Sequence, residues 1–197
     1  TPVSLGVAMR DAFIRTDQAF LNNKPNSSGT TAVVVLLANP YLVVGNAGDS
    51  RAYVRRDGRA LELTVDHKPD REDETARIVA AGGFVAQGRV MHLLAVSRAL
   101  GDREFKKSQD NDPDALELRE SLVIADPEVR ICRVQQGDEL LLACDGLWDV
   151  MSPNDAFGFL DEAGARSNAP RAVMQLVKAA ETRYGSTDNV TAIYARL

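Results

Sequence analysis

The stretch between residues 31 and 65 constrains the fold most, because it alternates short apolar segments with turn residues. The apolar segments are rich in β-branched residues, and the last of the turns, Asp57-Gly58, is typical of a two-residue hairpin. Such dense strand–turn–strand order predicts an antiparallel meander. Its four strands are expected at residues 31–37, 41–47, 51–55 and 60–65.

Helical patterns flank this meander on both sides. Residues 3–21 and 171–184 carry apolar residues at helical spacing, and a charged helix over 71–81 is expected to end at Gly82-Gly83. Residues 152–155 predict a helix start. Ser152 supplies the capping hydroxyl, Pro153 lies in the first turn, and Asp155 is the acidic residue three positions after the cap, as in a capping box. Further strands are predicted around Val90 and Ala95, as a hairpin of 128–134 with 139–144, and at 190–197. This order predicts an α+β fold with sheets at the centre and helices outside.

Length and charge narrow the class of protein. A chain of 197 residues is expected to form one domain with a sizeable core. The net charge is -5 and no Lys/Arg block occurs, which argues against a nucleic-acid partner, and no apolar run is long enough to span a membrane. Cys132 and Cys144 have no Cys-x-x-Cys spacing, so we expect two reduced, buried thiols in an intracellular protein, cytoplasmic or nuclear. No arginine follows Cys144 closely, and no Gly-rich phosphate loop occurs, so cysteine-phosphatase and nucleotide-binding chemistry are excluded.

Three aspartates stand beside predicted strands and are candidate metal ligands. Asp145 follows the buried apolar run 140–144, Asp49 follows the strand at 41–47, and Asp188 precedes the strand at 190–197. If those strands are neighbours, the carboxylates share a cleft, where their mutual repulsion favours bound cations. Oxygen ligands without a His or Cys cluster favour magnesium or manganese over zinc. Taken alone, Asp145-Gly146 is better explained by an ordinary turn.

Six motifs in order resemble the metal-dependent type 2C serine/threonine protein phosphatases. They cover the chain from residue 28 to its last strand, and a helix at 3–21 also fits that fold. They are Ser-Gly-Thr-Thr-Ala at 28–32, Val-Gly-Asn-Ala-Gly-Asp-Ser-Arg at 44–51, Leu-Thr-Val-Asp-His-Lys-Pro at 63–69, Leu-Ala-Val-Ser-Arg-Ala-Leu-Gly-Asp at 94–102, Asp-Gly-Leu-Trp-Asp-Val at 145–150 and Ser-Thr-Asp-Asn-Val-Thr at 186–191.

The resemblance implies a β-sandwich of two antiparallel sheets flanked by helix pairs, in four αββα layers. It implies two Mg or Mn ions and possibly a third, with Asp145 and Asp188 as ligands and catalytic residues, Asp49 at the third position and Asp149 as its companion. The implied reaction is hydrolysis of phosphoserine and phosphothreonine in proteins by a metal-activated water, without a phosphoenzyme. The implied partner is a phosphoprotein substrate, and residues 84–122 resemble the flap that is tied to substrate choice in that family.

The chain departs from the family pattern at its start. These 197 residues hold no phosphate-gripping Arg before residue 3, no Glu-Asp pair and no Asp-Gly-His-Gly-Gly loop. His67, in Asp-His-Lys-Pro, is expected to have a structural role, and His92 a surface or packing role. We expect the chain to be the C-terminal portion of one larger catalytic domain, poorly active alone and lacking that domain's N-terminal strands. The alternative is a catalytically incomplete pseudophosphatase or regulatory module that binds partners on the same fold.

Overall fold

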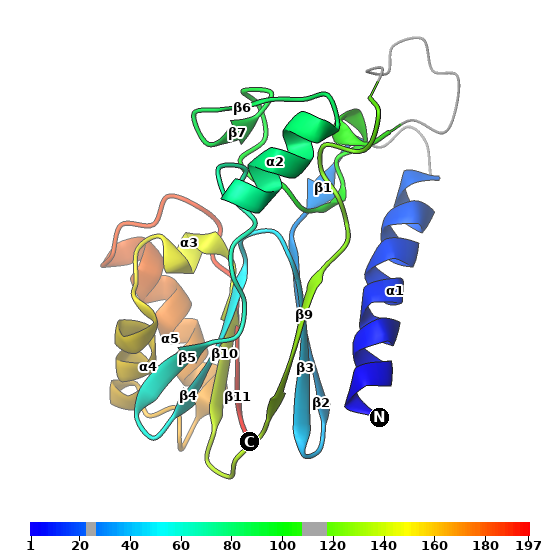
Figure 1. Cartoon of the computed structure of the whole chain (residues 1–197). Coiled ribbons are helices and arrows are strands. Elements are labelled where there is room, and N and C mark those ends of the chain that lie inside the picture. Colours follow the sequence, from blue (N-terminus) through cyan, green and yellow to red (C-terminus); the bar gives the residue numbers. More distant parts are fainter. Residues whose placement is uncertain (23–26, 108–117) are drawn as a thin grey trace. The chain divides into compact units, whose positions relative to one another are not determined.

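A computed structural model describes residues 1–22, 27–107 and 118–197 of the chain (Figure 1). The described residues form two compact units that alternate along the sequence. The first unit comprises Thr1–Val34, Gly45–Asp49 and Asp66–Val129, and the second comprises Val35–Val44, Ser50–Val65 and Arg130–Leu197. Antiparallel sheets and helices make up both, as the α+β prediction requires.

A four-stranded sheet in the order β11-β10-β4-β5 is the centre of the second unit. Its strands are β4 (Arg51–Arg56), β5 (Arg59–Glu62), β10 (Glu139–Ala143) and β11 (Ala192–Arg196), and every pairing is antiparallel. The predicted hairpin turn joins β4 to β5, with φ of 49° at Asp57 and 76° at Gly58. β10 is buried along its whole length, because it lies between two other strands and under helices.

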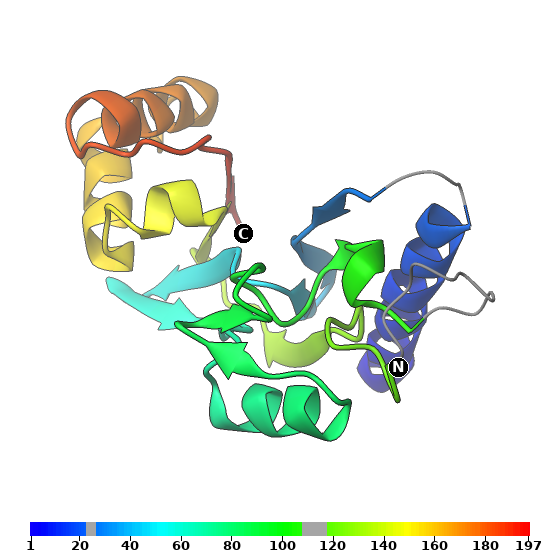
Figure 2. The ribbon, with the colours of Figure 1, turned by 90° about the horizontal axis from the view of Figure 1, so that it is seen from above.

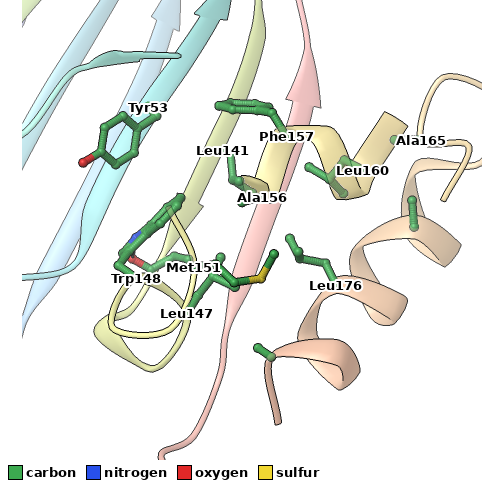
Figure 3. Packing of buried hydrophobic residues seen from close by; sticks show 13 residues of the cluster. Tyr53, Leu141, Leu147, Trp148, Met151, Ala156, Phe157, Leu160, Ala165 and Leu176 are labelled. Carbon is green, nitrogen blue, oxygen red and sulfur yellow. Dashed lines mark hydrogen bonds between the residues drawn. The ribbon is translucent and has the colours of Figure 1, made fainter. Parts of the chain in front are cut away.

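Helices α4 (Pro153–Glu162) and α5 (Ala169–Thr182) pack on one face of that sheet (Figures 1 and 2). α4 begins as predicted, since the Ser152 hydroxyl accepts from the Asp155 amide at 3.2 Å. Arg55 of β4 joins helix to sheet, because its guanidinium lies 4.9 Å from the Phe157 ring centre and pairs with both Glu139 and Asp161. Figure 3 shows the apolar core, to which α4 contributes Phe157 and Leu160, α5 Leu176 and β10 Leu141.

The first unit is organised around α1 (Pro2–Leu21) and α2 (Glu72–Ala80). α2 ends before Gly82, whose φ of 100° suits glycine at a helix C-terminus. Beside it lies the hairpin of β6 (Val85–Ala86) and β7 (Arg89–Val90), and β1 (Gly29–Thr30) pairs with β8 (Leu100–Gly101) (Figure 2). A second apolar cluster contains Ile78, Ala81, Val90, Val96, Ala99, Phe105, Leu122 and Val123.

Strands β2 (Ala32–Ala38), β3 (Tyr41–Ala47) and β9 (Glu128–Arg133) form a separate sheet in the order β2-β3-β9. The prediction of one meander over 31–65 is therefore wrong, since β3 and β4 belong to different sheets and Gly48-Asp49-Ser50 carries the chain between them. The prediction of a hairpin between 128–134 and 139–144 is also wrong. β9 pairs with β3, whereas β10 pairs with β4 and β11, because the apolar run Leu140 to Ala143 is buried best in the middle of a sheet.

Two details between residues 84 and 122 also differ from the predictions. No strand forms around Ala95, where the structure has only an isolated bridge between Val90 and Leu94. The charge-rich, apolar-poor composition of residues 103–122 predicts a mobile surface insertion, but both described ends of that segment are anchored. Phe105, the last residue of the short 3-10 helix η1 (Arg103–Phe105), and Leu122 are buried in the second cluster. Residues 108–117 of the insertion lie outside the described residues.

Candidate metal site

The turn that follows β10 carries Asp145 and is held rigidly in the second unit. Asp145 is the first residue of the one-turn helix α3 (Asp145–Trp148), and its side chain is half-buried. The indole of Trp148 donates to the carbonyl of Ala143 at 2.8 Å and meets the Tyr53 ring edge-on, with ring centres 5.0 Å apart (Figure 3). We call residues 143–149 the Asp145 turn, and its backbone is fixed to the strand from which it emerges.

The loop that carries Asp188 lies directly against the Asp145 turn. We call residues 185–191 the Asp188 loop. The Cys144 amide donates to the carbonyl of Thr191 at 3.2 Å, and a Cβ on Gly146 would lie only 2.3 Å from the carbonyl oxygen of Asn189. Only glycine fits at position 146, because the backbone of Asn189 occupies the space that a Cβ would need, as the Asp-Gly motif predicts. The structure thus brings together the two segments that carry Asp145 and Asp188.

Asp149 stands one helical turn after Asp145, and its carboxylate is exposed. Its amide donates to the Asp145 carbonyl at 2.8 Å, so the two residues have the i, i+4 relation that places side chains on one helix face. The Asp188 carboxylate is exposed too, and its Oδ1 accepts from the Asn189 amide at 2.7 Å. Among the described residues, neither the carboxylate of Asp149 nor Oδ2 of Asp188 has a hydrogen-bonding or ionic partner.

Asp49 belongs to the first unit and has a partner of its own. It is only 6% exposed and pairs with the ammonium of Lys68. The turn before it is held by His67, whose amide donates to the Gly48 carbonyl at 3.0 Å and whose Nδ1 accepts from the Gly48 amide at 3.2 Å. A place for Asp49 in a third metal position therefore stays a prediction.

The two histidines have the surroundings expected of structural residues. His67 is fully buried, and burial, together with the positive charge of Arg98, lowers the pKa of its imidazole. Nδ1 lies 3.2 Å from both the amide nitrogen and the carbonyl oxygen of Gly48, and Nε2 faces Glu128 Oε1 at 3.5 Å. His92 is exposed and meets the Phe84 ring edge-on, but it lies in a turn with φ of 64° rather than in a strand.

The donor set of the second unit fits a hard cation in kind but not in number. Carboxylate oxygens are the ligands that magnesium and manganese prefer. Across residues 1–22, 27–107 and 118–197, however, no three His, Cys, Asp or Glu side chains are grouped so that they could hold a metal ion. Asp145 and Asp188 can therefore supply part of a metal site, and further ligands must come from water or other residues.

Sequence reasoning missed the residues that join the Asp145 turn to the Asp188 loop. Ser186 and Cys144 contact the opposite segment, as described below, although Cys144 was expected to be only a buried thiol. Cys144 is half-buried instead, and neither cysteine is in a disulfide. One indication of this role was present in the sequence, because Cys144 is next to Asp145 and Ser186 is two residues before Asp188.

Comparison with known proteins identifies the family. The family model described as Protein phosphatase 2C matches residues 3–190. The chain belongs to the protein phosphatase 2C family. The chain is 45% identical over 157 residues to Protein phosphatase 2C homolog 2 of Aspergillus fumigatus, and 40% identical over 196 residues to Probable protein phosphatase 2C 59 of Arabidopsis thaliana. The family depends on metal ions, and its members are protein phosphatases, as the six motifs led us to expect.

Solved structures of the family share the fold of this chain. A crystal structure of serine-threonine phosphatase 2C from Toxoplasma gondii superposes with a TM-score of 0.76 at 27% identity, covering 96% of this chain and 66% of that one. The structure of a C. elegans sex determining protein gives a TM-score of 0.74 at 28% identity, with 94% and 45% covered. The match spans 35% of the Aspergillus relative and 57% of the Arabidopsis relative. No described helix is long and apolar enough to cross a membrane.

Proposed function

We propose that the protein containing this chain hydrolyses phosphoserine and phosphothreonine in proteins with the help of Mg or Mn. The proposal is supported by membership of the protein phosphatase 2C family and by relatives that carry the name protein phosphatase. The observation that carries it is the direct contact between the Asp145 turn and the Asp188 loop in the second unit.

The chain's own residues would hold the cations and contribute no nucleophile. Asp145 and Asp188 would supply oxygen ligands from two fixed backbones, and the positive charge of a bound cation would offset their negative charges. When bound, divalent cations supply a water whose pKa is near neutral and neutralise charge on the phosphoryl oxygens. The thiol of Cys144 and the hydroxyl of Ser186 are both engaged with backbone groups, consistent with direct attack by water on phosphorus.

The complete site is proposed to hold two or three ions. Asp149 is the better candidate for the third position, because it follows Asp145 by one turn and its carboxylate is exposed. Asp49 is the weaker candidate, since a cation there would have to displace the ammonium of Lys68.

Substitution of the two ligands in the longest available form of the protein tests the proposal. We expect Asp145→Ala and Asp188→Ala each to lower manganese-dependent hydrolysis of a phosphothreonine peptide by at least about 100-fold, as loss of a charge-stabilising catalytic group does. Glu162→Ala removes an exposed carboxylate of α4 and should leave the rate unchanged. Wild-type activity in both aspartate variants would refute the metal role. The 197-residue chain alone should bind these ions weakly and turn over poorly.

The alternative function is that of a pseudophosphatase or regulatory module. The finding that favours it is the missing third ligand among the described residues. The two functions differ in turnover, because a binding module would give no manganese-dependent hydrolysis even in the longest form of the protein, while its fold and thermal stability would be normal.

The remaining proposals concern the extent of the domain, the substrate-binding flap and the cellular compartment. We propose residues 1–197 as part of one catalytic domain, and residues 84–122 as a flap that contacts the phosphoprotein substrate. The free thiols of Cys132 and Cys144 support an intracellular compartment, cytoplasmic or nuclear.

A further inference from the structure

Side-chain contacts at two points join the Asp145 turn to the Asp188 loop. The Ser186 hydroxyl donates to the Gly146 carbonyl at 2.7 Å. The Cys144 thiol donates to the Asn189 carbonyl at 3.2 Å and its sulfur accepts from the Thr191 amide at 3.3 Å. Each segment is thus connected to the other immediately beside the aspartate that it carries.

Ser186 is held by the end of α5 rather than by its own loop. Its amide donates to the Ala180 carbonyl at 2.9 Å, after Gly185 has turned the chain with φ of 78°. Ala180 and Leu176 of the same helix are buried in the apolar core of Figure 3. The hydroxyl therefore reaches the Asp145 turn from a rigid support.

The carbonyl of Gly146 depends on this hydroxyl because α3 ends after one turn. The amide of Val150, which would bond to Gly146 if the helix continued, donates to Leu147 at 3.2 Å instead. The carbonyl belongs to a buried residue, and leaving a buried carbonyl without a hydrogen bond is energetically costly. Without Ser186, the Asp145 turn would therefore shift to pair that oxygen elsewhere.

We propose that Ser186 and Cys144 are positioning residues that fix the Asp188 loop on the Asp145 turn, so that the affinity for the cation depends on them. Asp145 lies between Cys144 and Gly146, and Asp188 lies between Ser186 and Asn189. Fixing these backbones against each other sets the spacing of the two carboxylates before the cation binds, which lowers the ordering cost of binding. This inference rests on the proposed metal-dependent function.

The test compares Mn²⁺ binding by wild-type protein and Ser186→Ala in the longest available form of the protein. Free Mn²⁺ is measured by its electron paramagnetic resonance signal, which needs no turnover. We expect Ser186→Ala to weaken Mn²⁺ binding about 10-fold, within the range of 10–100-fold known for residues that support metal ligands. Hydrolysis at saturating Mn²⁺ should stay within about 2-fold of wild type, and Ser186→Thr, which keeps the hydroxyl, should restore the affinity.

A matched control and a second variant separate positioning from general destabilisation. Thr182→Ala removes a hydroxyl that donates to the Lys178 carbonyl at 2.8 Å on the same helix, and it should leave Mn²⁺ binding unchanged. Cys144→Ala should weaken binding as Ser186→Ala does, which keeps the test decisive if one variant does not fold.

The outcomes also distinguish this inference from the proposed function. If Asp188→Ala abolishes Mn²⁺ binding while the Ser186 and Cys144 variants bind as wild type, the positioning role is overturned and the function stands. If Asp188→Ala itself binds Mn²⁺ normally, both are overturned. A loss of turnover at saturating Mn²⁺ with unchanged affinity would also overturn the positioning role.

Discussion

Glu74 of α2 is a buried carboxylate surrounded by arginines, and its removal should destabilise the first unit strongly. Its side chain is 1% exposed. Arg98 donates to Oε1 at 2.6 Å, Arg77 donates to Oε2 at 2.7 Å, and a third guanidinium, that of Arg71, stands 3.6 Å away. Arg77 and Arg98 also donate to the carbonyls of Ser97, Leu122 and Asp126, so Glu74 fixes α2 to residues well separated in sequence.

The contribution of the Glu74 carboxylate to the free energy of unfolding can be obtained in two ways, which give similar values. Burial alone would raise the pKa of Glu74, but hydrogen bonds from Arg98, Ser97 and Arg77 outweigh it and lower the pKa from 4.5 to about 2. That difference corresponds to about 3 kcal/mol of stability at pH 7. Removing one partner of a buried ion pair costs roughly 3–5 kcal/mol, because the other charges are left uncompensated. We therefore expect Glu74→Gln to lower the free energy of unfolding by at least about 3 kcal/mol.

The same contribution should fade in acid. Because the folded-state pKa is depressed, the stabilisation is complete above the unfolded-state pKa of 4.5 and is lost as the pH falls towards about 2. At pH 3 only roughly 1 kcal/mol should remain. The difference between wild type and Glu74→Gln should shrink accordingly between pH 7 and pH 3.

Urea unfolding followed by far-UV circular dichroism at several pH values measures both effects, and hydrogen exchange of α2 localises them. Glu72→Gln is the matched control, because Glu72 is an exposed carboxylate on the same helix, and its substitution should change stability by less than about 0.5 kcal/mol. A loss below about 1 kcal/mol for Glu74→Gln, or a loss that is the same at pH 7 and pH 3, would refute this account of the arginine cluster.

Two further substitutions test the second unit. Leu176→Ala, at a fully buried position of α5, should cost about 2–5 kcal/mol in urea unfolding followed by tryptophan fluorescence, whereas Met174→Ala, 73% exposed on that helix, should cost less than about 0.5. Equal costs would show that the core is placed wrongly. Gly146→Ala should cost about 1–3 kcal/mol and weaken Mn²⁺ binding, since its Cβ would stand 2.3 Å from the Asn189 carbonyl oxygen. Gly158→Ala in α4 is the control, because a Cβ there meets nothing within 4 Å, and it should be neutral or stabilising. A crystal structure of Gly146→Ala in which the two loops have not moved would contradict the close approach of Gly146 to Asn189.

Local structure could be predicted from the sequence where a residue determines its own conformation. The Ser152 cap, the Asp57-Gly58 turn and the end of α2 at Gly82 all follow from backbone or capping preferences of the residues concerned. Helices α1, α2 and α5, the start of α4 and the strands of the four-stranded sheet lie within a few residues of the predicted bounds, whereas the short helix α3 was not predicted.

The partner of each strand could not be predicted in the same way. Neighbours in sequence suggested a hairpin of β9 with β10, but pairing is decided by burial, and Leu140 to Leu142 need strands on both sides. Likewise Phe105 and Leu122 lie at the ends of a charged segment, so their burial depends on Ile78 and Val90, far away in the chain.

The candidate site was predicted in part, for a related reason. The Asp145 turn lies against the Asp188 loop because β10 and β11, the strands beside them, are neighbours in the sheet. Asp49, by contrast, lies next to Lys68, and its sequence motif did not indicate that ion pair. Whether these aspartates bind a cation stays a prediction.

The pairing of β4 with β10 delays completion of the sheet during synthesis of the chain. Arg55 and its partner Glu139 are 84 positions apart, so the β4–β5 hairpin leaves the ribosome long before the strand that completes its sheet. At about 5–20 residues per second, the wait is roughly 4–17 s, during which one edge of the hairpin is open to other chains. Chaperone contact during translation is therefore expected to concentrate on nascent chains that end between β5 and β10.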